Sequence, residues 1–300
     1  MLEQNGSGAL AAAAAAAATG AEQTAYELVA SIQTDVGCVR EANEDSGRYT
    51  KPNDPALLAD KGTLLIVADG MGGHASGEVA SGMAVELVSR LYYQGTEGDS
   101  QAVLKAAVEE ANRQVYAAST KDEKLHGMGT TCTALVLRGG VAISAHVGDS
   151  RIYLRRGGQT YLMTEDHSAV MEMVKHGIIT LEEARHHADK NVILRALGTS
   201  PEVEAAIWEK PLSIQTGDQF LLCSDGLYDL VEDEEINTVL ANANDPHEAC
   251  EQLIALAKER GGHDNITVGI VHLQPAGGES SSSNADSQNL RITREIEAAK

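Results

Sequence analysis

The chain is 300 residues long, with an apolar fraction of 43%, few aromatic residues and a formal net charge of −21 at pH 7. This acidic excess argues against nucleic acid or an anionic membrane as a partner, because both attract clustered Lys and Arg. No apolar stretch reaches the length of about 18 residues that a transmembrane helix needs. We therefore expect a globular protein that binds neither nucleic acid nor a membrane.

The composition divides the chain into a folded middle and two ends of a different character. Residues 1–24 contain an alanine run with no basic segment before it, so we interpret them as a disordered, low-complexity lead and not as a signal peptide. The chain becomes rich in Gly, Ser and Asn after Gln274, which predicts a flexible polar tail over 275–300. One folded domain is expected over 25–274.

The four cysteines indicate a reducing compartment. None of them belongs to a C-x-x-C pair, and each has apolar or small neighbours in the sequence. We predict reduced core thiols in a cytoplasmic protein, at Cys38, Cys132, Cys223 and Cys250.

The domain begins with a strand and continues in a polar loop. Apolar and polar residues alternate over 26–33, which is typical of a strand with one wetter face. The loop that follows contains Arg40 and the acidic pair Glu44-Asp45, and the next apolar run is expected only at Ala56. Taken alone, this acidic pair is a solvated surface, since carboxylates are usually exposed.

Two distant stretches share one sequence pattern, an apolar strand that leads to Asp-Gly. The runs 64–68 and 218–223 lead to Asp69-Gly70 and Asp225-Gly226. We expect the glycine to let the backbone turn tightly behind the carboxylate, although Asp-Gly is also ordinary turn chemistry. Apolar stripes of helical spacing predict helices at about 79–91, 100–119 and 246–260.

Two hairpins predict an antiparallel sheet. Residues 131–137 and 141–147 flank one glycine-containing turn, and 152–154 and 161–163 flank another. Strands that are paired in this way form an antiparallel sheet and not βαβ units. A last strand over 266–271 directly follows Asp264-Asn265.

The segment 165–200 differs from its surroundings and is expected to be a small helical insertion that lies over a site. One short helix ends at Gly177, and another begins with a capping box, Thr180-x-x-Glu183. The adjacent His186 and His187 have the chemistry of zinc ligands, but the spacing supplies no second pair of ligands. Solvated histidines are therefore the simpler interpretation.

Acidic side chains stand at the ends of several predicted strands and in the loops between them. If they meet at one edge of the sheet, they raise each other's pKa or require cations. Carboxylate, carbonyl and water oxygens suit Mg²⁺ or Mn²⁺, and a two-ion site activates water for displacement at phosphorus. Spacing alone does not establish that they meet. The residues concerned are Glu44, Asp45, Asp69, Asp149, Asp225 and Asp264.

Six motifs in this order, over about residues 25–273, resemble the metal-dependent Ser/Thr protein phosphatases of the PPM or type 2C family, in their compact bacterial form. One Asp-Gly is weak on its own, but six motifs in order are specific. They are Arg40-x-x-x-Glu44-Asp45, Ala68-Asp69-Gly70-Met71-Gly72-Gly73-His74, Gly129-Thr130-Thr131, Val147-Gly148-Asp149-Ser150-Arg151, Ser224-Asp225-Gly226 and Asp264-Asn265.

The resemblance implies an α+β fold, a four-layer α-β-β-α sandwich of two antiparallel sheets, with the insertion 165–200 as a flap that touches the substrate protein. It implies two Mn²⁺ or Mg²⁺ ions, bridged by Asp69, with the Gly70 carbonyl on one ion and Asp225 and Asp264 completing the shell of the other. Glu44 and Asp45 would act at or just behind these ions. Asp149 resembles the residue that holds, with Asp225, a third and weaker metal.

The resemblance also implies the chemistry. A hydroxide that bridges the two ions attacks the phosphorus of phosphoserine or phosphothreonine in line, while Arg40 offers its planar fork to the phosphoryl oxygens. Arg40, Asp69, Asp225 and Asp264 are thus the expected catalytic residues. The general acid stays unassigned. In animal relatives a histidine at the position of Met71 is proposed as the general acid. Here His74 is either the general acid or a structural residue at the start of a helix. A metal-bound water could also donate the proton to the leaving group.

Two other functions stay open beside an active phosphoprotein phosphatase. One is a catalytically silent module on the same fold that binds phosphoproteins or a partner. The other is a phosphatase whose substrate is a small, dedicated partner protein of an anti-sigma pathway. For the leading hypothesis the expected partners are phosphorylated Ser/Thr proteins, including a partner Ser/Thr kinase or its substrates. The family also implies a monomer.

Overall fold

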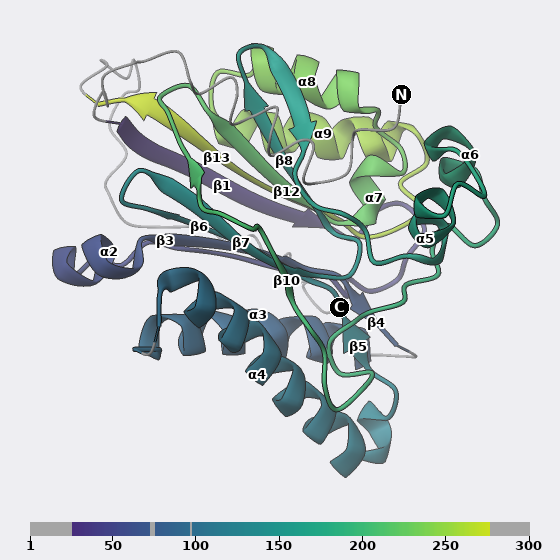
Figure 1. Cartoon of the computed structure of the whole chain (residues 1–300). Helices are drawn as coiled ribbons and strands as arrows, with labels where there is room; N and C mark the ends of the chain where they lie inside the picture. Colours follow the sequence, from purple (N-terminus) through teal and green to yellow (C-terminus); the bar gives the residue numbers. More distant parts are fainter. Residues whose placement is uncertain (1–25, 73–75, 97, 277–300) are drawn as a thin grey trace, which may run out of the picture.

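The computed structural model describes residues 26–72, 76–96 and 98–276, which form a four-layer sandwich (Figure 1). Two antiparallel sheets face each other. The long helices α3 (Ser76–Gln94) and α4 (Ser100–Lys121) cover the outer face of one sheet, and α8 (Asp233–Asn242) and α9 (Pro246–Glu259) cover the other. The predicted α-β-β-α fold is confirmed.

The two sheets contain five and six strands, and a two-stranded ribbon, β4-β5, lies at one end. The first sheet has the order β1-β13-β12-β8-β9, and the second has the order β10-β7-β6-β3-β2 with β11 beside β7. The strands are β1 (Tyr26–Asp35), β2 (Ser46–Thr50), β3 (Thr63–Ala68), β4 (Gly70–Met71), β5 (Gly129–Thr130), β6 (Cys132–Arg138), β7 (Val141–Val147), β8 (Arg151–Arg156), β9 (Gln159–Leu162), β10 (Ala206–Ile207), β11 (Leu212–Ser213), β12 (Gln219–Cys223) and β13 (Ile266–Pro275).

Strand β3 shows why the central strands are apolar on both faces. Leu64 and Ile66 pack into the layer beneath α3 and α4, whereas Leu65 and Val67 pack into the layer between the sheets. A strand that is covered on both sides has no polar face, so its sequence is a continuous apolar run. A third apolar layer lies beneath α8 and α9.

Several elements differ from the predictions. Strand β2 was expected to be loop, because its sequence Ser-Gly-Arg-Tyr-Thr has no apolar alternation; it forms by antiparallel pairing with β3. The helices α2 (Pro55–Lys61) and α8 were also not predicted, and the short α7 (Asp225–Tyr228) begins at the second Asp-Gly pair. Cys38 is exposed, and the prediction that it is a core thiol is wrong, whereas the other three cysteines are buried and all four are free.

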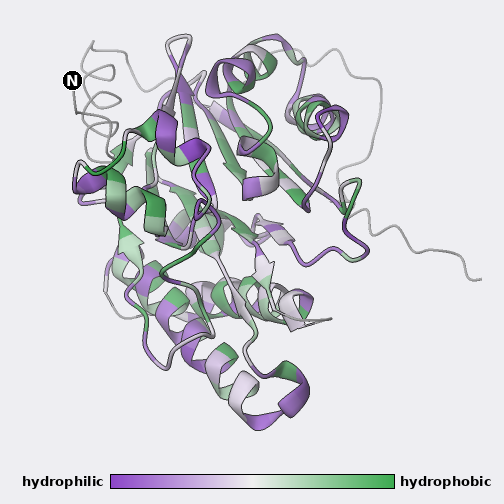
Figure 2. Cartoon of the chain, turned by 90° about the vertical axis from the view of Figure 1, so that its right-hand side faces the viewer, coloured by the Kyte–Doolittle hydropathy of each residue, from purple (hydrophilic) through white to green (hydrophobic). Residues whose placement is uncertain are grey.

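The insertion between β9 and β10 holds α5 (Ala169–Lys175) and α6 (Leu181–Arg185) at the end of the sandwich that carries β4 and β5 (Figures 1 and 2). It has a small apolar core of its own, around Met171 and Ala184. The capping box that joins Thr180 and Glu183 is confirmed. His186 is exposed, and the described residues contain no cluster of zinc-ligating side chains.

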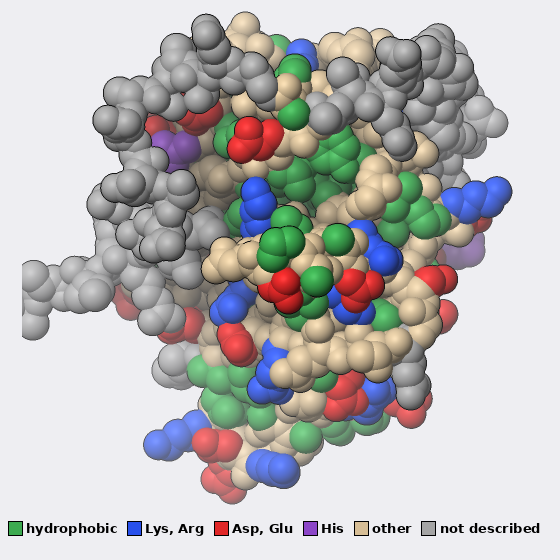
Figure 3. All heavy atoms as spheres, turned by 90° about the vertical axis from the view of Figure 1, so that its left-hand side faces the viewer, with side chains coloured by type: hydrophobic (Ala, Val, Ile, Leu, Met, Phe, Trp, Pro, Cys, Tyr) green, Lys and Arg blue, Asp and Glu red, His purple; other side chains and the backbone are tan. Residues whose placement is uncertain are grey.

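The opposite end of the sandwich shows mixed charge. In Figure 3, Lys and Arg side chains alternate with Asp and Glu over the part of this face that is not drawn in grey. No helix among the described residues is long and apolar enough to cross a membrane. The predicted lead 1–24 and almost all of the predicted tail lie outside the described residues, and β13 continues through Pro275, where the tail was expected to begin.

Candidate metal centre

The two Asp-Gly pairs stand at strand ends, as the sequence predicts, and meet at the end of the sandwich where β4 and β5 lie. Asp69 directly follows β3, and Asp225 begins α7, one residue beyond β12. The pKa of Asp69 is raised by burial and by the neighbouring charges of Asp45, Asp225, Asp149 and Asp264. Asp45, Asp149, Asp225 and Asp264 therefore lie close enough to Asp69 to interact with its carboxylate.

The backbone of Asp69 is held by Thr130, which ends β5, and by Thr131, which lies between β5 and β6. The Asp69 amide donates to Thr131 Oγ1 over 2.8 Å, and the Asp69 carbonyl accepts from the Thr131 amide and from Thr130 Oγ1 over 2.8 and 2.9 Å. Both threonines are fully buried. These bonds satisfy the backbone amide and carbonyl of Asp69. The backbone position of Asp69 is thereby fixed, and its carboxylate is the part of the residue that can serve the site.

Gly70 and Gly226 are needed because other backbone segments pack closely against them, and not because the chain turns tightly there. Neither Gly70 nor Gly226 has a left-handed backbone. A Cβ atom on Gly70 would lie 2.2 Å from the Gly77 carbonyl oxygen and 2.4 Å from that of Glu44, and one on Gly226 would lie 2.0 Å from the Asn265 carbonyl oxygen. The predicted reason for glycine is wrong at both positions, and packing of the backbone is the actual one.

Asn265 fastens the loop that carries Glu44 and Asp45. Its side-chain amide donates to the carbonyls of Val36 and Ala42, and its oxygen accepts from the Glu44 amide over 2.8 Å. Asn265 belongs to the predicted motif Asp264-Asn265, but no role was predicted for it. Its position beside Asp264 at the start of a buried strand was the available signal.

Asp45 and Glu44 behave differently within that loop. Asp45 is buried, and Ser224, the residue before Asp225, donates its hydroxyl to Asp45 Oδ2 over 2.7 Å. Burial raises the pKa of Asp45 to about 6, although Ser224 and Thr267 lower it. Glu44 is half-buried, and burial likewise raises its pKa.

Asp225 and Asp149 are a second buried pair whose pKa values are raised. The Asp225 Oδ1 atom is buried and accepts no hydrogen bond from a described residue. Burial, followed by the charges of Asp149 and Asp264, raises the Asp225 pKa well above its usual range. Asp149 is 3% exposed, and burial raises its pKa to about 7.

Arg40 is the cation of the site. Its side chain is half-exposed, and its Nη2 donates to Asp264 Oδ2 over 2.9 Å. That hydrogen bond, together with the charges of Asp264, Glu44 and Asp225, raises the Arg40 pKa. The guanidinium thus stands beside the carboxylates with part of its surface in solvent.

The chemistry of these donors fits hard divalent cations, although no three His, Cys, Asp or Glu side chains in the described ranges already surround one point as a metal cage. Asp264 is turned to Arg40, and Asp45 to Ser224, so two of the carboxylates face protein donors. Against this, Asp225 keeps a buried oxygen without a donor. Several buried carboxylates of mutually raised pKa are a donor set that Mg²⁺ or Mn²⁺ would neutralise.

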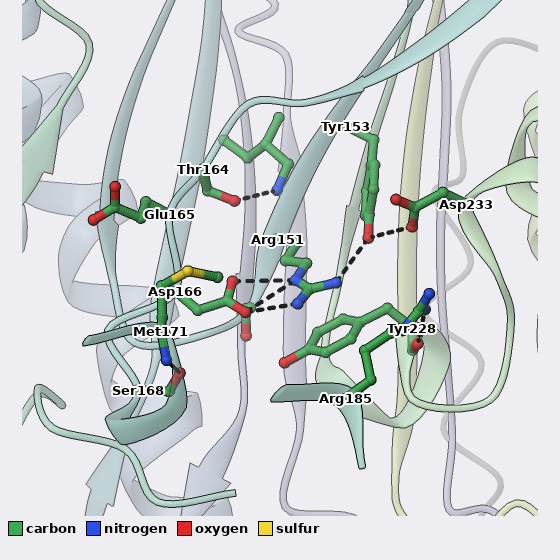
Figure 4. Close-up of polar contacts among 12 residues, drawn as sticks. Arg151, Tyr153, Thr164, Glu165, Asp166, Ser168, Met171, Arg185, Tyr228 and Asp233 are labelled. Atoms are coloured by element: carbon green, nitrogen blue, oxygen red, sulfur yellow. Dashed lines mark hydrogen bonds and ion pairs between the residues drawn. The ribbon is translucent and has the colours of Figure 1, made fainter. Parts of the chain in front are cut away.

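A polar network connects this site to the base of the insertion (Figure 4). Arg151 binds Asp166 through two nitrogens, at 2.7 to 3.2 Å, and its guanidinium carbon lies 3.6 Å from the ring centroid of Tyr228. Asp166 leads into the insertion, Arg151 follows Asp149 by two residues, and Tyr228 ends α7. Tyr153 extends the network, because it accepts from Arg151 and donates to Asp233.

Insertion residues further along the chain bind the same region. Arg185 donates to the Tyr228 carbonyl over 3.3 Å and pairs with Glu232, and Lys190 pairs with Asp229 over 2.5 Å. No role was predicted for these residues, because ion pairs between distant segments leave no local pattern in the sequence. His74, the uncertain general acid, lies outside the described residues.

A fold of this kind, with buried carboxylates at the end of two facing sheets, is that of a metal-dependent phosphatase. The family model of protein phosphatase 2C matches residues 48–259. The Serine/threonine phosphatase stp of Listeria welshimeri is 39% identical over 248 residues, which cover 81% of this chain and 94% of that protein. This chain belongs to the protein phosphatase 2C family.

Solved structures agree with this assignment. The serine/threonine phosphatase PstP/Ppp of Mycobacterium tuberculosis has a TM-score of 0.73 at 39% identity, covering 82% of this chain and 99% of that one. A structure of the PstP catalytic domain in complex with two manganese ions has a TM-score of 0.71 at 38% identity, covering 83% and 100%.

Proposed function

We propose that this chain hydrolyses phosphoserine and phosphothreonine in proteins in a metal-dependent reaction. The observation that carries this function is the convergence of Asp69, Asp225 and Asp264 with Asp45 and Asp149 at one end of a protein phosphatase 2C fold. The family and the two manganese ions of the related PstP structure support a phosphatase that depends on Mn²⁺ or Mg²⁺.

We assign the cation ligands from the residues present. Asp69 would bridge two ions, the Gly70 carbonyl would bind one, and Asp225 and Asp264 would complete the shell of the other. Glu44 and Asp45 would lie at or behind the ions, and Asp149 with Asp225 would hold a third, weaker ion. When bound, such ions act as Lewis acids and lower the pKa of a water molecule, which prepares it for displacement at phosphorus.

The chain itself binds and orients the phosphoryl group. Arg40 is half-exposed, and its planar fork offers paired donors to two phosphoryl oxygens, a geometry that Lys cannot reproduce. Cys223, two residues before Asp225, is buried with a pKa raised by that burial, which argues against a covalent phosphoenzyme on this thiol. The role of His74 stays a prediction.

The expected partners follow from this activity. The substrates are phosphorylated Ser/Thr proteins, and we propose that they include a partner Ser/Thr kinase or its substrates. We also propose a monomer in the cytoplasm, a location that agrees with four free cysteines. No observation favours the silent binding module, because every acidic residue of the expected set is present.

Hydrolysis of p-nitrophenyl phosphate and of a phosphothreonine peptide tests the function directly. We expect turnover with Mn²⁺ or Mg²⁺ and none with EDTA, together with its loss in Asp69→Asn. A folded chain that binds Mn²⁺ but turns over neither substrate would leave the silent module as the function.

A further inference from the structure

A cavity of about 300 Å³ lies between the insertion and the edge of the second sheet, and nothing described above makes use of it. Ser144 and His146 of β7 and Thr164 line it, and Trp208 closes one side. His167 and Arg195 come from the two ends of the insertion. We call this cavity the flap pocket. Its volume is at the lower end of the range for small-ligand sites.

His167 presents a hydrogen-bond donor to the flap pocket. The Gly148 amide donates to His167 Nδ1 over 3.1 Å, so Nδ1 is unprotonated and the proton of the neutral ring is on Nε2. The His167 residue is 8% exposed, and its Nε2 makes no hydrogen bond to a described residue. The ring is largely buried, but its Nε2–H is open to the flap pocket, where an acceptor can bind it.

Two hydroxyls add further donors. Thr164 Oγ1 accepts from the Ile152 amide over 3.1 Å, which leaves its proton free to donate, and Thr164 lies on the segment that leads into the insertion (Figure 4). Ser144 is 1% exposed and bonds to no described side chain or backbone group. The other polar groups of the floor are occupied, since the Trp208 indole donates to the Met163 carbonyl.

Arg195 gives the flap pocket its charge. It is exposed and forms neither an ion pair nor a hydrogen bond within the described ranges. Lys175 also lines the pocket, but it pairs with Glu165 and Glu172. The charge of Glu165 is balanced by its ion pair with Lys175. Arg195 is therefore a cation at the rim without an ion pair to a described residue. The exposed Glu209 is a further lining residue.

We propose that the flap pocket binds a phosphate group, held by the Arg195 guanidinium, His167 Nε2–H and the hydroxyls of Thr164 and Ser144. Convergent donors around one cation are the arrangement that binds phosphate. The group comes either from a second phosphorylated residue of the substrate protein or from free inorganic phosphate, the product of the reaction. The first source rests on the proposed function, and the second does not.

Binding can be measured without turnover. We would titrate the full-length, metal-free chain, with ¹⁵N-labelled histidines, with inorganic phosphate and follow the His167 Nε2 resonance. We expect a saturable shift, and about tenfold weaker binding in Arg195→Gln, because a charge-assisted bond to phosphate is lost. Ser144→Ala should weaken binding by about threefold, because it removes a neutral donor from a buried site.

Lys210→Gln is the matched control, because it removes one exposed positive charge near the flap pocket without changing its lining. It should bind phosphate as the unchanged chain does. If phosphate left the His167 resonance unmoved, or if Lys210→Gln weakened binding as much as Arg195→Gln, the flap pocket would not be a phosphate site. This result is independent of whether the chain hydrolyses any substrate.

Two peptides separate the sources. One carries a single phosphothreonine and the other carries an additional phosphoserine. If the second phosphate of a substrate occupies the flap pocket, Arg195→Gln lowers kcat/KM about tenfold for the doubly phosphorylated peptide only. If Arg195→Gln changes kcat/KM equally for both peptides, while inorganic phosphate still shifts the His167 resonance, free phosphate is the ligand. Either pattern supports the site, and a His167 resonance that does not respond to inorganic phosphate overturns it.

Discussion

The loop that contains Gly148 and Asp149 separates two buried groups of titratable side chains with opposite behaviour. On one side, burial raises the carboxyl pKa values of Asp69, Asp149 and Asp225. On the other side, the rings of His146 and His167 lie 4.8 Å apart, and burial lowers their pKa values to about 4 and about 3.

The same physical cause produces both shifts. A low-dielectric environment penalises whichever protonation state carries the charge, so it favours protonated carboxyls and neutral imidazoles. The consequences for binding differ. A group of carboxylates with too few donors requires cations, whereas neutral donors beside an unpaired Arg195 require an anion.

Asp69→Asn should have the largest effect, because it removes the carboxylate that we place between two cations. We expect kcat to fall by about 10³-fold. Calorimetry should show weaker Mn²⁺ binding at the same time. The flap pocket is the internal control, since the variant should still shift the His167 resonance with phosphate. Full activity of Asp69→Asn at saturating Mn²⁺ would contradict the proposed ligand set.

Gly70→Ala should destabilise the carboxylate side by about 2–4 kcal/mol, because its Cβ would overlap two backbone carbonyl oxygens that cannot yield cheaply. Gly82→Ala is the matched control. Gly82 is exposed on α3, and its Cβ would meet only Ser46 Oγ at 3.9 Å. That change should stabilise by about 0.5–1 kcal/mol through helix propensity. Denaturant unfolding measures both, and equal effects would refute the packing argument.

The two groups should give opposite pH slopes to the stability of the metal-free chain. His146 binds fewer protons folded than unfolded between about pH 4 and 6.5, so its contribution to stability is lost as the pH falls through that window. Asp149 binds more protons folded than unfolded up to about pH 7, so its contribution is lost as the pH rises through its own window.

Unfolding midpoints in EDTA across this pH range test those signs. His146→Gln should become relatively more stable than the unchanged chain at low pH, by roughly 2–3 kcal/mol between pH 6.5 and 4. Asp149→Asn should become relatively more stable at high pH. Parallel curves for all three proteins would show that burial does not perturb these groups.

Arg40→Lys should have the smallest effect. Lysine keeps the charge but loses the planar fork, so we expect KM for a phosphothreonine peptide to rise about tenfold, with a smaller change in kcat. Arg48→Lys is a suitable control, because Arg48 on β2 also pairs with a single carboxylate, that of Glu86, which is not one of the proposed site residues. An unchanged KM in Arg40→Lys would remove Arg40 from phosphate binding.

The sequence alone determined the elements whose pattern is local. Apolar runs identified β3 and β12, helical spacing identified α3, α4 and α9, and the Thr180 capping box located α6. The motifs around Asp69, Asp149, Asp225 and Asp264 identified the family. Strand β2 and helix α8 were not found, because their short, polar sequences acquire order from the elements against which they pack.

How these parts meet depends on contacts between segments that are far apart in the chain. Convergence of five acidic residues depends on which strand ends share an edge, and that is a property of sheet order. Segments far apart in the chain meet in the close packing at Gly70 and Gly226, in the hydrogen bonds of Asn265 and in the flap pocket. Such contacts depend on long-range packing, which no local pattern of residues encodes.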